Sequence, residues 1–150
     1  MTRSAPLQQS LFSAAAPAFD AGFRSLERIA LDPEAWVDFA PGWVEGPDAL
    51  FKEIIDSRAW KQRTRWMYQR RVREPRLTAP WSLGSGDALE PAILERMRRC
   101  LSARYGVTFD SVGFNLYRDG EAQRTWEHCV PKVARAGPRI SLAFRHGMDG

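Results

Sequence analysis

The sequence predicts an α+β fold, in which two amphipathic helices precede a sheet of antiparallel strands. Two stretches with apolar residues at helical spacing lie before Gly106. Beyond Gly106 the apolar pattern changes to alternation, which is typical of strands with one buried face. Helices followed by strands, without regular alternation of the two, favour an antiparallel sheet over a parallel one.

A first helix is expected to begin at Gly46-Pro47-Asp48 and to end near Arg58. Proline suits the first helical turn because the amide hydrogen that it lacks would have no partner there. One apolar stripe follows, formed by Leu50, Phe51, Ile54 and Ile55. This stripe would face the core.

A second helix is expected from about Glu90 to Arg104. Pro91 again fits the first turn, and Gly106 can adopt the left-handed conformation that often follows a helix C-terminus. Apolar positions recur at helical spacing, at Leu89, Ile93, Met97, Cys100 and Leu101. The intervening arginines are expected to form the solvated face, namely Arg96, Arg98 and Arg99.

Two C-terminal segments alternate strictly between apolar and polar or small residues. In Ser111 to Tyr117, Asn115 and Tyr117 project from the same face of the predicted strand. In Arg139 to Arg145, both terminal arginines point to one side. Upstream, two further segments are extended in character, namely Leu26 to Phe39, broken at Asp32-Pro33, and Lys61 to Val72.

Composition indicates one domain behind a loosely held tail. Residues 1–22 carry few charges and are expected to be flexible, whereas residues 23–150 are expected to form the domain. The two cysteines, Cys100 and Cys129, are typical of buried thiols. No apolar run reaches the roughly 18 residues that span a bilayer. We therefore expect a cytoplasmic monomer without a membrane partner.

The strand from Arg139 to Arg145 suggests an anion site. Only the small residues Ser141 and Ala143 lie between the two arginines on that face. A dicarboxylate needs a bidentate partner for each end, and arginine supplies one. The alternative is an outer face with solvated charges, which this spacing alone does not exclude.

The segment from Arg58 to Arg76 combines cations with aromatic rings. The segment contains eight basic residues and a single acidic residue, Glu74. Three aromatic residues are interleaved with them, namely Trp60, Trp66 and Tyr68. Basic groups neutralise phosphates and aromatic faces stack on unpaired bases, so the segment is a candidate nucleic-acid surface. The alternative is a solvated strand pair with ordinary core aromatics.

Three motifs then occur in a characteristic order. They are Phe114-Asn115-Leu116-Tyr117-Arg118-Asp119-Gly120, Gln123-Arg124-Thr125-Trp126-Glu127-His128 followed by Pro131, and Pro138-Arg139-Ile140-Ser141-Leu142-Ala143-Phe144-Arg145. Together they resemble the AlkB family of Fe(II)- and 2-oxoglutarate-dependent dioxygenases, which repair alkylated nucleic acid. The likeness continues upstream at residues 35–43 and 67–78, and so covers about residues 11–145.

The resemblance implies roles for particular residues. Asn115 and Tyr117 would hold 2-oxoglutarate, Arg139 would pair with its distal carboxylate, and Arg145 would bind near its other end. His128 would be an iron ligand, although a lone histidine is more often a structural residue. The family's substrate lid would fall on the basic segment, at Trp66, Tyr68, Arg70, Arg71, Arg73 and Arg76. The implied partner is single-stranded or damaged DNA, or RNA.

One part of the family pattern is missing. The family follows Tyr-Arg-Asp-Gly with His-x-Asp, which supplies two of the three ligands of the iron triad. Here Gly120 is followed by Glu121, Ala122 and Gln123, without a histidine. The resemblance therefore implies an incomplete double-stranded β-helix, or jelly roll, with an N-terminal α/β lead-in and with core strands missing between Gly120 and Gln123.

That gap changes the expected function. Family members hydroxylate an N-alkyl group, and the product releases formaldehyde and the bare base. With two ligands absent, we expect no stable iron binding and no oxidative dealkylation by this chain. One alternative is a non-catalytic nucleic-acid-binding remnant, and another is the product of a deleted or misassembled gene.

Overall fold

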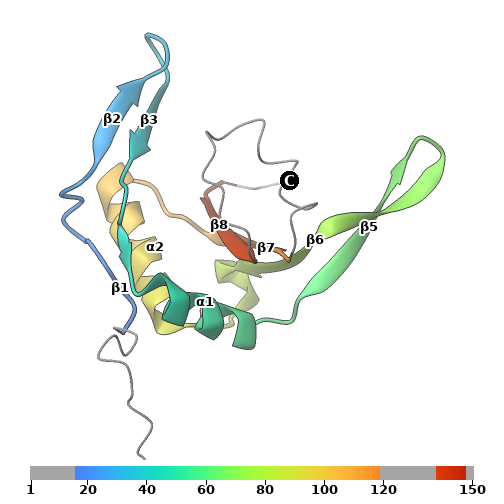
Figure 1. The fold of residues 1–150 in the computed structure, drawn as a ribbon. Helices are drawn as coiled ribbons and strands as arrows, with labels where there is room; N and C mark the ends of the chain where they lie inside the picture. Colours follow the sequence, from blue (N-terminus) through green and yellow to red (C-terminus); the bar gives the residue numbers. More distant parts are fainter. Residues whose placement is uncertain (1–15, 119–137, 148–150) are drawn as a thin grey trace, which may run out of the picture. The chain divides into compact units, whose positions relative to one another are not determined.

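The computed structural model of the chain describes residues 16–118 and 138–147 and has a mixed α+β fold (Figure 1). The chain divides into two compact units, Met1–Glu53 and Ile54–Gly150. Within the described residues there are two α-helices, and every strand pair is antiparallel. The expected α+β class with antiparallel sheet is therefore confirmed. No helix in the described part of the chain is long and apolar enough to cross a membrane.

The first unit contains two small strand pairs. Strand β1 (Ala18–Phe19) pairs with β4 (Val44–Glu45), and β2 (Glu27–Ala30) pairs with β3 (Trp36–Phe39). Trp43 joins the first pair to the turn after β1, because its indole Nε1 donates a hydrogen bond of 2.9 Å to the backbone oxygen of Asp20. The β1 strand lies inside the segment whose composition suggested a flexible tail.

Strands β2 and β3 pair antiparallel on either side of Asp32-Pro33, so the segment expected to be extended and broken at that point forms a hairpin. The Asp32 carboxylate turns the chain by accepting backbone hydrogen bonds from Glu34 and Ala35 at 2.8 and 2.7 Å. Across the strands, Arg28 makes two hydrogen bonds to the Asp38 carboxylate, at 2.8 and 3.0 Å. These interactions fix the turn and the register of the hairpin.

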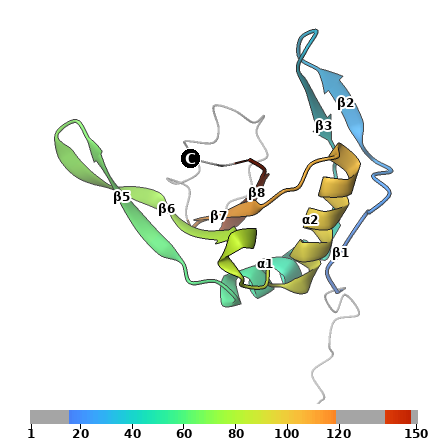
Figure 2. The same cartoon turned by 180° about the vertical axis from the view of Figure 1, so that it is seen from behind.

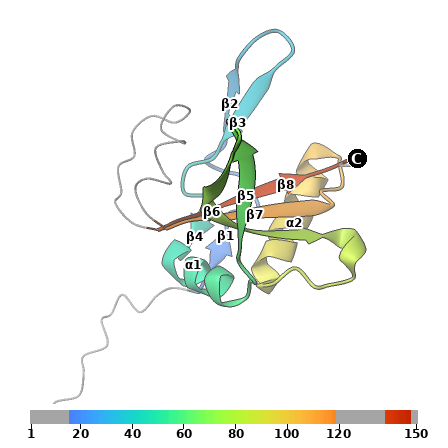
Figure 3. The same ribbon diagram turned by 90° about the vertical axis from the view of Figure 1, so that its right-hand side faces the viewer.

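Helix α1 (Pro47–Asp56) begins at the expected proline and buries Leu50 and Ile54. Helix α2 (Ala92–Tyr105) starts one residue after Pro91, which is extended and precedes the helix instead of lying in its first turn. Gly106 takes the left-handed conformation at the helix end, with φ 64° and ψ 26°. Helix α2 lies beside β7 (Ser111–Tyr117), on one side of the four-stranded sheet of the second unit, which we call the main sheet (Figures 2 and 3).

Arg98 does not lie on the solvated face of α2, so that expectation was wrong. Arg98 is only 7% exposed. The guanidinium donates to both carboxylate oxygens of Glu95, at 2.8 and 2.7 Å, and to the backbone oxygen of Phe109 at 2.8 Å. A buried cation is tolerated when it is paired and hydrogen-bonded in this way. Arg98 therefore ties α2 to the loop that leads into the main sheet.

The second unit is built on a four-stranded antiparallel sheet with the order β5-β6-β7-β8. Its strands are β5 (Lys61–Met67), β6 (Arg70–Ser82), β7 (Ser111–Tyr117) and β8 (Arg139–Arg145), and a short 3-10 turn, η1 (Leu83–Ser85), follows β6. The last two strands have the bounds that the alternation predicted. Figure 1 shows β5 and β6 continuing as a two-stranded ribbon beyond β7 and β8.

The long strand β6 contains two prolines, which its pairing accommodates. Pro75 lies opposite a register shift between Gln62 and Thr64 of β5, where the ladder is interrupted. Pro80 lies beyond Lys61↔Thr78, the last β5 pair, so within the described residues one edge of β6 has no strand beside it there. Proline, which donates no backbone hydrogen bond, is found at such edges and irregularities.

The Glu95 and Arg98 pair predicts a particular pH dependence of stability. Hydrogen bonding to Arg98 lowers the pKa of Glu95 from 4.5 to about 2. Because the folded-state pKa is depressed, the stabilisation is present above pH 4.5 and is lost as the pH falls from 4.5 towards 2. Between pH 6 and pH 3, the free energy of unfolding of Glu95→Gln, measured by urea denaturation, should therefore fall less than that of the wild type.

Glu53→Gln, which removes an exposed carboxylate from α1, is the matched control and should follow the wild type. If Glu95→Gln and the wild type lose the same unfolding free energy over this pH range, the pair does not stabilise the fold.

Candidate functional site

One face of the main sheet carries polar, small and basic side chains from three adjacent strands. The cross-strand register of β6, β7 and β8 arranges these residues in four rows, and we call this surface the polar face. From one end to the other, the rows are Arg76, Tyr117 and Arg139; Thr78, Asn115 and Ser141; Pro80, Gly113 and Ala143; and Ser82, Ser111 and Arg145.

The opposite face of the same strands is apolar. Val112, Phe114 and Leu116 of β7 alternate with the polar residues and are nearly fully buried, as are Ala79 and Trp81 of β6. Since successive side chains of a strand point to opposite faces, burying one set fixes where the other set points. Burial of the apolar face therefore determines which side chains form the polar face.

The four residues predicted to bind 2-oxoglutarate share the polar face. Tyr117 is opposite Arg139, and Asn115 is opposite Ser141, to whose hydroxyl its Nδ2 donates a hydrogen bond of 3.4 Å. Arg145 lies at the other end, opposite Ser111. The two predicted arginines therefore point to the same side of β8, as the alternation required.

The first row pairs a buried tyrosine with an arginine on each neighbouring strand. Tyr117 is buried, with Arg76 on one neighbouring strand and Arg139 on the other. A hydrogen bond to Tyr117 raises the pKa of Arg76, and Glu74 acts in the same direction. Arg76 was predicted only as part of the basic segment, yet its pairing makes it a member of the polar face.

Two hydroxyls on the polar face are buried without a hydrogen-bond partner in the described structure. They are Thr78 Oγ1 in the second row and Ser111 Oγ in the fourth. An unsatisfied buried hydroxyl usually costs about 1–3 kcal/mol. The two-residue alternation of Thr78, Pro80 and Ser82 with Leu77, Ala79 and Trp81 could have revealed this contribution of β6 from the sequence.

A cavity of about 590 Å³ borders the last two rows of the polar face. Its lining includes Pro80, Ser82, Ser111, Gly113 and Arg145, together with Trp81 and Val112 of the opposite face, the two residues that follow α1, and residues of the loop before α2. Arg58 also lines it, and burial lowers the pKa of this guanidinium, which lies 4.0 Å from the centre of the Phe114 ring.

The predicted iron ligand His128 lies outside the described residues. Within residues 16–118 and 138–147, no three histidine, cysteine, aspartate or glutamate side chains are grouped so that they could hold a metal ion. The role of His128 stays a prediction from the resemblance.

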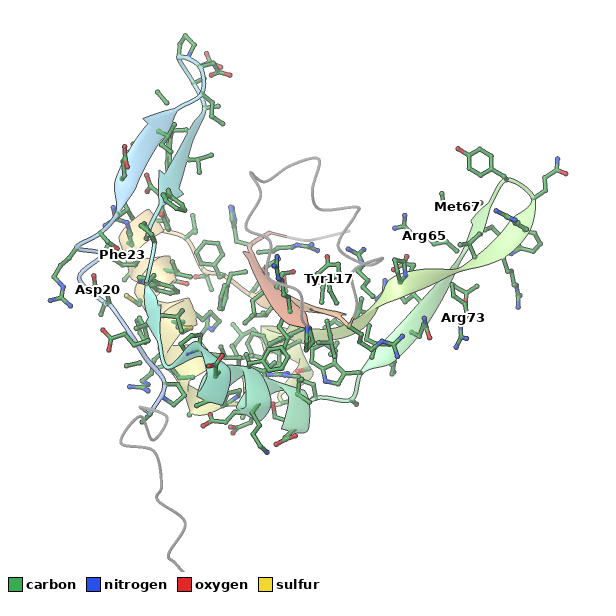
Figure 4. The ribbon with its side chains drawn as sticks, viewed as in Figure 1. Asp20, Phe23, Arg65, Met67, Arg73 and Tyr117 are labelled. Atoms are coloured by element: carbon green, nitrogen blue, oxygen red, sulfur yellow. The ribbon has the colours of Figure 1, made fainter. Side chains whose placement is uncertain are left out.

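The basic segment forms a hairpin of β5 and the first part of β6. Its tip is aromatic and exposed, with Trp66 70% and Tyr68 91% exposed. The guanidinium of Arg71 lies 5.9 Å from the centre of the Trp66 ring. Figure 4 shows Arg65, Met67 and Arg73 on this projecting hairpin. We call the residues from Lys61 to Arg73 the basic hairpin.

Not every residue of the predicted basic segment belongs to that exposed surface. Trp60 is partly buried and its indole Nε1 donates a hydrogen bond of 3.1 Å to the backbone oxygen of Ile55. Glu74 forms ion pairs with Arg65 at 2.7 Å and with Arg76 at 3.5 Å. Of the predicted nucleic-acid-binding residues, five therefore lie on the basic hairpin, namely Trp66, Tyr68, Arg70, Arg71 and Arg73.

The turn of the basic hairpin is strained. Tyr68 and Gln69 both have positive φ, at 50° and 64°, in the two central positions where asparagine and glycine are usual. We predict that Gln69→Gly raises the free energy of unfolding by about 1 kcal/mol, because glycine adopts positive φ without steric cost. Urea denaturation measures this change.

Thr64→Gly, at an exposed strand position of the same hairpin, is the control and should lower the unfolding free energy. If both substitutions lower the free energy of unfolding by the same amount, the turn stores no strain.

The sequence matches no model of a known protein family and no curated protein. The resemblance of its motifs and the geometry of the polar face and the basic hairpin are therefore the grounds on which a function can be proposed.

Proposed function

We propose that this chain is an AlkB-like protein of oxidative nucleic-acid dealkylation that retains the 2-oxoglutarate-binding and nucleic-acid-binding surfaces but not the iron site. The observation that carries this proposal is the common face shared by Asn115, Tyr117, Arg139 and Arg145, which their motifs required and the register of β7 and β8 provides. The antiparallel main sheet is compatible with one sheet of an incomplete jelly roll, preceded by an α/β lead-in.

The polar face suits a small dianion. The guanidinium group of arginine forms bidentate hydrogen bonds with a carboxylate. The polar face has arginines at both ends and small polar residues between them. Arg139 and Tyr117 would hold one carboxylate, Asn115 would contact the middle of the molecule, and Arg145 would approach the other end. The unpartnered hydroxyls of Thr78 and Ser111 are further donors on that face. In the family, 2-oxoglutarate is the cosubstrate, and its oxidation to succinate and carbon dioxide supplies electrons that reduce dioxygen.

The residues present do not fit a bound iron. A 2-His-1-carboxylate site needs three protein ligands on one side of the metal. The chain has two histidines, His128 and His146, and no His-x-Asp follows Gly120.

The basic hairpin supports nucleic-acid binding over the competing interpretation of a solvated strand pair with core aromatics. Trp66 and Tyr68 are exposed, unlike ordinary core rings, and Arg71 lies beside Trp66. Exposed aromatic faces can stack on bases while neighbouring cations neutralise phosphates. Because this surface needs no metal, a non-catalytic nucleic-acid-binding protein is the second candidate function.

A first prediction concerns single-stranded DNA, measured by fluorescence anisotropy at several salt concentrations. Replacing Arg70, Arg71 and Arg73 together by alanine should weaken binding and reduce the salt slope by up to about 2, since each phosphate contact contributes about 0.7. Trp66→Ala should weaken binding with little change in slope, because stacking releases no counterions.

Arg96→Ala combined with Arg104→Ala removes exposed charge from α2 and should leave binding nearly unchanged. An affinity that the triple substitution does not alter would show that the basic hairpin is only a solvated surface.

A second prediction separates cosubstrate binding from turnover. Calorimetry should detect 2-oxoglutarate binding that Arg139→Ala abolishes, because that substitution removes a bidentate carboxylate partner. With added Fe(II), succinate should not exceed the level of a metal-free sample, since two ligands are missing. Iron-dependent succinate formation that His128→Ala abolishes would overturn the proposed loss of catalysis.

A further inference from the structure

The hairpin of β2 and β3 carries an apolar face that is exposed to solvent. Cross-strand partners share a face, so Glu27 with Phe39 and Ile29 with Val37 lie on the same side. Leu31 continues that side by alternation. The four apolar residues of this face are between 43% and 64% exposed. Because an isolated two-stranded hairpin is at best marginally stable in water, such a face is expected to pack against a partner.

The opposite face of this hairpin has its interactions within the hairpin itself. Arg28 makes its two hydrogen bonds to Asp38 there, and its guanidinium carbon lies 3.7 Å from the centre of the Trp36 ring. We call the residues from Glu27 to Phe39 the acidic hairpin, because they include four carboxylates and a single arginine. Since Asp38 is the carboxylate bound by that arginine, the acidic hairpin keeps an excess of negative charge.

The basic hairpin combines the opposite charge with exposed rings. It contains six basic residues and no acidic residue. Its register pairs Trp66 with Arg71 and Thr64 with Arg73, which places these four side chains on one side of the hairpin. The exposed Trp66 ring therefore has two arginines beside it on the same side.

The exposed large apolar side chains of the described residues are concentrated on these two hairpins. All of them except Leu83 belong to the acidic hairpin or to the basic hairpin. Grouped apolar residues that are surrounded by polar ones mark interaction sites, and opposite charges on two surfaces favour their association. The two hairpins are therefore complementary in charge, and each offers apolar surface that the other can cover.

We infer that the apolar face of the acidic hairpin is a self-association surface, and that its occupant is the basic hairpin of a second copy of this chain. The Trp66 ring of one copy packs on the apolar face of the other. The arginines beside that ring then approach the carboxylates of Glu27 and Glu34. The contact joins two different surfaces, so one copy can use both of its hairpins at once. This inference is independent of cosubstrate and nucleic-acid binding, and it replaces the monomer expected from composition.

The first test is sedimentation velocity of the full chain at increasing protein concentration, at low and at high salt. The average mass should rise with concentration, and high salt should weaken the association because it screens the charges. Glu27→Gln combined with Glu34→Gln should raise the dissociation constant roughly 2- to 30-fold, since two exposed ion pairs are lost. Trp66→Ala should raise it at least about tenfold, because a buried aromatic ring carries much of the binding energy of an interface.

Glu45→Gln combined with Glu53→Gln is the matched control. It makes the same change in net charge at two exposed carboxylates outside the acidic hairpin. This variant should associate like the wild type. If it weakens the association as much as the glutamine pair at Glu27 and Glu34, only net charge matters and the inferred contact is wrong.

Charge reversal tests the two sides of the contact against each other. Glu27→Lys with Glu34→Lys reverses the acidic hairpin, and Arg71→Glu with Arg73→Glu reverses one side of the basic hairpin. Neither double variant should associate alone, whereas an equimolar mixture should, because each supplies the surface that the other has lost. Circular dichroism establishes that each variant is folded. If a reversed variant does not fold, the glutamine pair and Trp66→Ala decide the question.

Three results would overturn the inference. The first is a monomer at every concentration, which includes the case in which the two hairpins of one chain bind each other. The second is association of the folded Arg71→Glu, Arg73→Glu variant by itself, which would mean that two acidic hairpins pack face to face. The third is a mixture of the two folded reversed variants that stays monomeric.

Discussion

The register of β6, β7 and β8 is the constraint on which the rest of the second unit depends. A strand has a side-chain period of two, so a slip of one residue would exchange its buried and exposed faces. Two backbone hydrogen bonds meet at Asp110, just before β7, and oppose such a slip. Leu83 donates to Asp110, and Asp110 donates to Arg145. Arg98 adds a side-chain bond to the oxygen of Phe109.

Much of the fold could be predicted because the local signals agreed with the tertiary structure. Alternation gave the bounds of β7 and β8, and Pro47 and Gly106 marked helix ends. Arg98 was misplaced because a charge at helical spacing is normally solvated, and its backbone partner Phe109 lies eleven residues further along the chain. A helical pattern carries no information about such a partner.

The candidate site was predicted in part for the same reason. Residues within one strand were placed on a common face correctly, as with Arg139 and Arg145. The alternation in β6 could have shown that Thr78, Pro80 and Ser82 share one face, but which strand lies beside β6 cannot be read from period-two patterns alone. The turn at Tyr68 and Gln69 was also hidden, since neither residue is a usual turn former, and the segment from Lys61 to Val72 therefore looked continuous.

One strand serves both candidate surfaces. The 13 residues of β6 run from the tip of the basic hairpin to the cavity beside the polar face. Glu74 lies between them and forms ion pairs with Arg65 of the basic hairpin and Arg76 of the polar face. The two surfaces are therefore joined by both continuous backbone and a shared carboxylate.

Pro80 has a consequence for the behaviour of the chain in concentrated solution. Sheet edges with free backbone donors and acceptors invite strands of other molecules to pair with them, which is a common start of aggregation. The part of β6 beyond Thr78 is such an edge within the described structure. A proline there offers an incoming strand an acceptor but no donor, so an added ladder would be broken at that point. Pro80, which lies beyond the last β5 pair, thus discourages self-association at this edge.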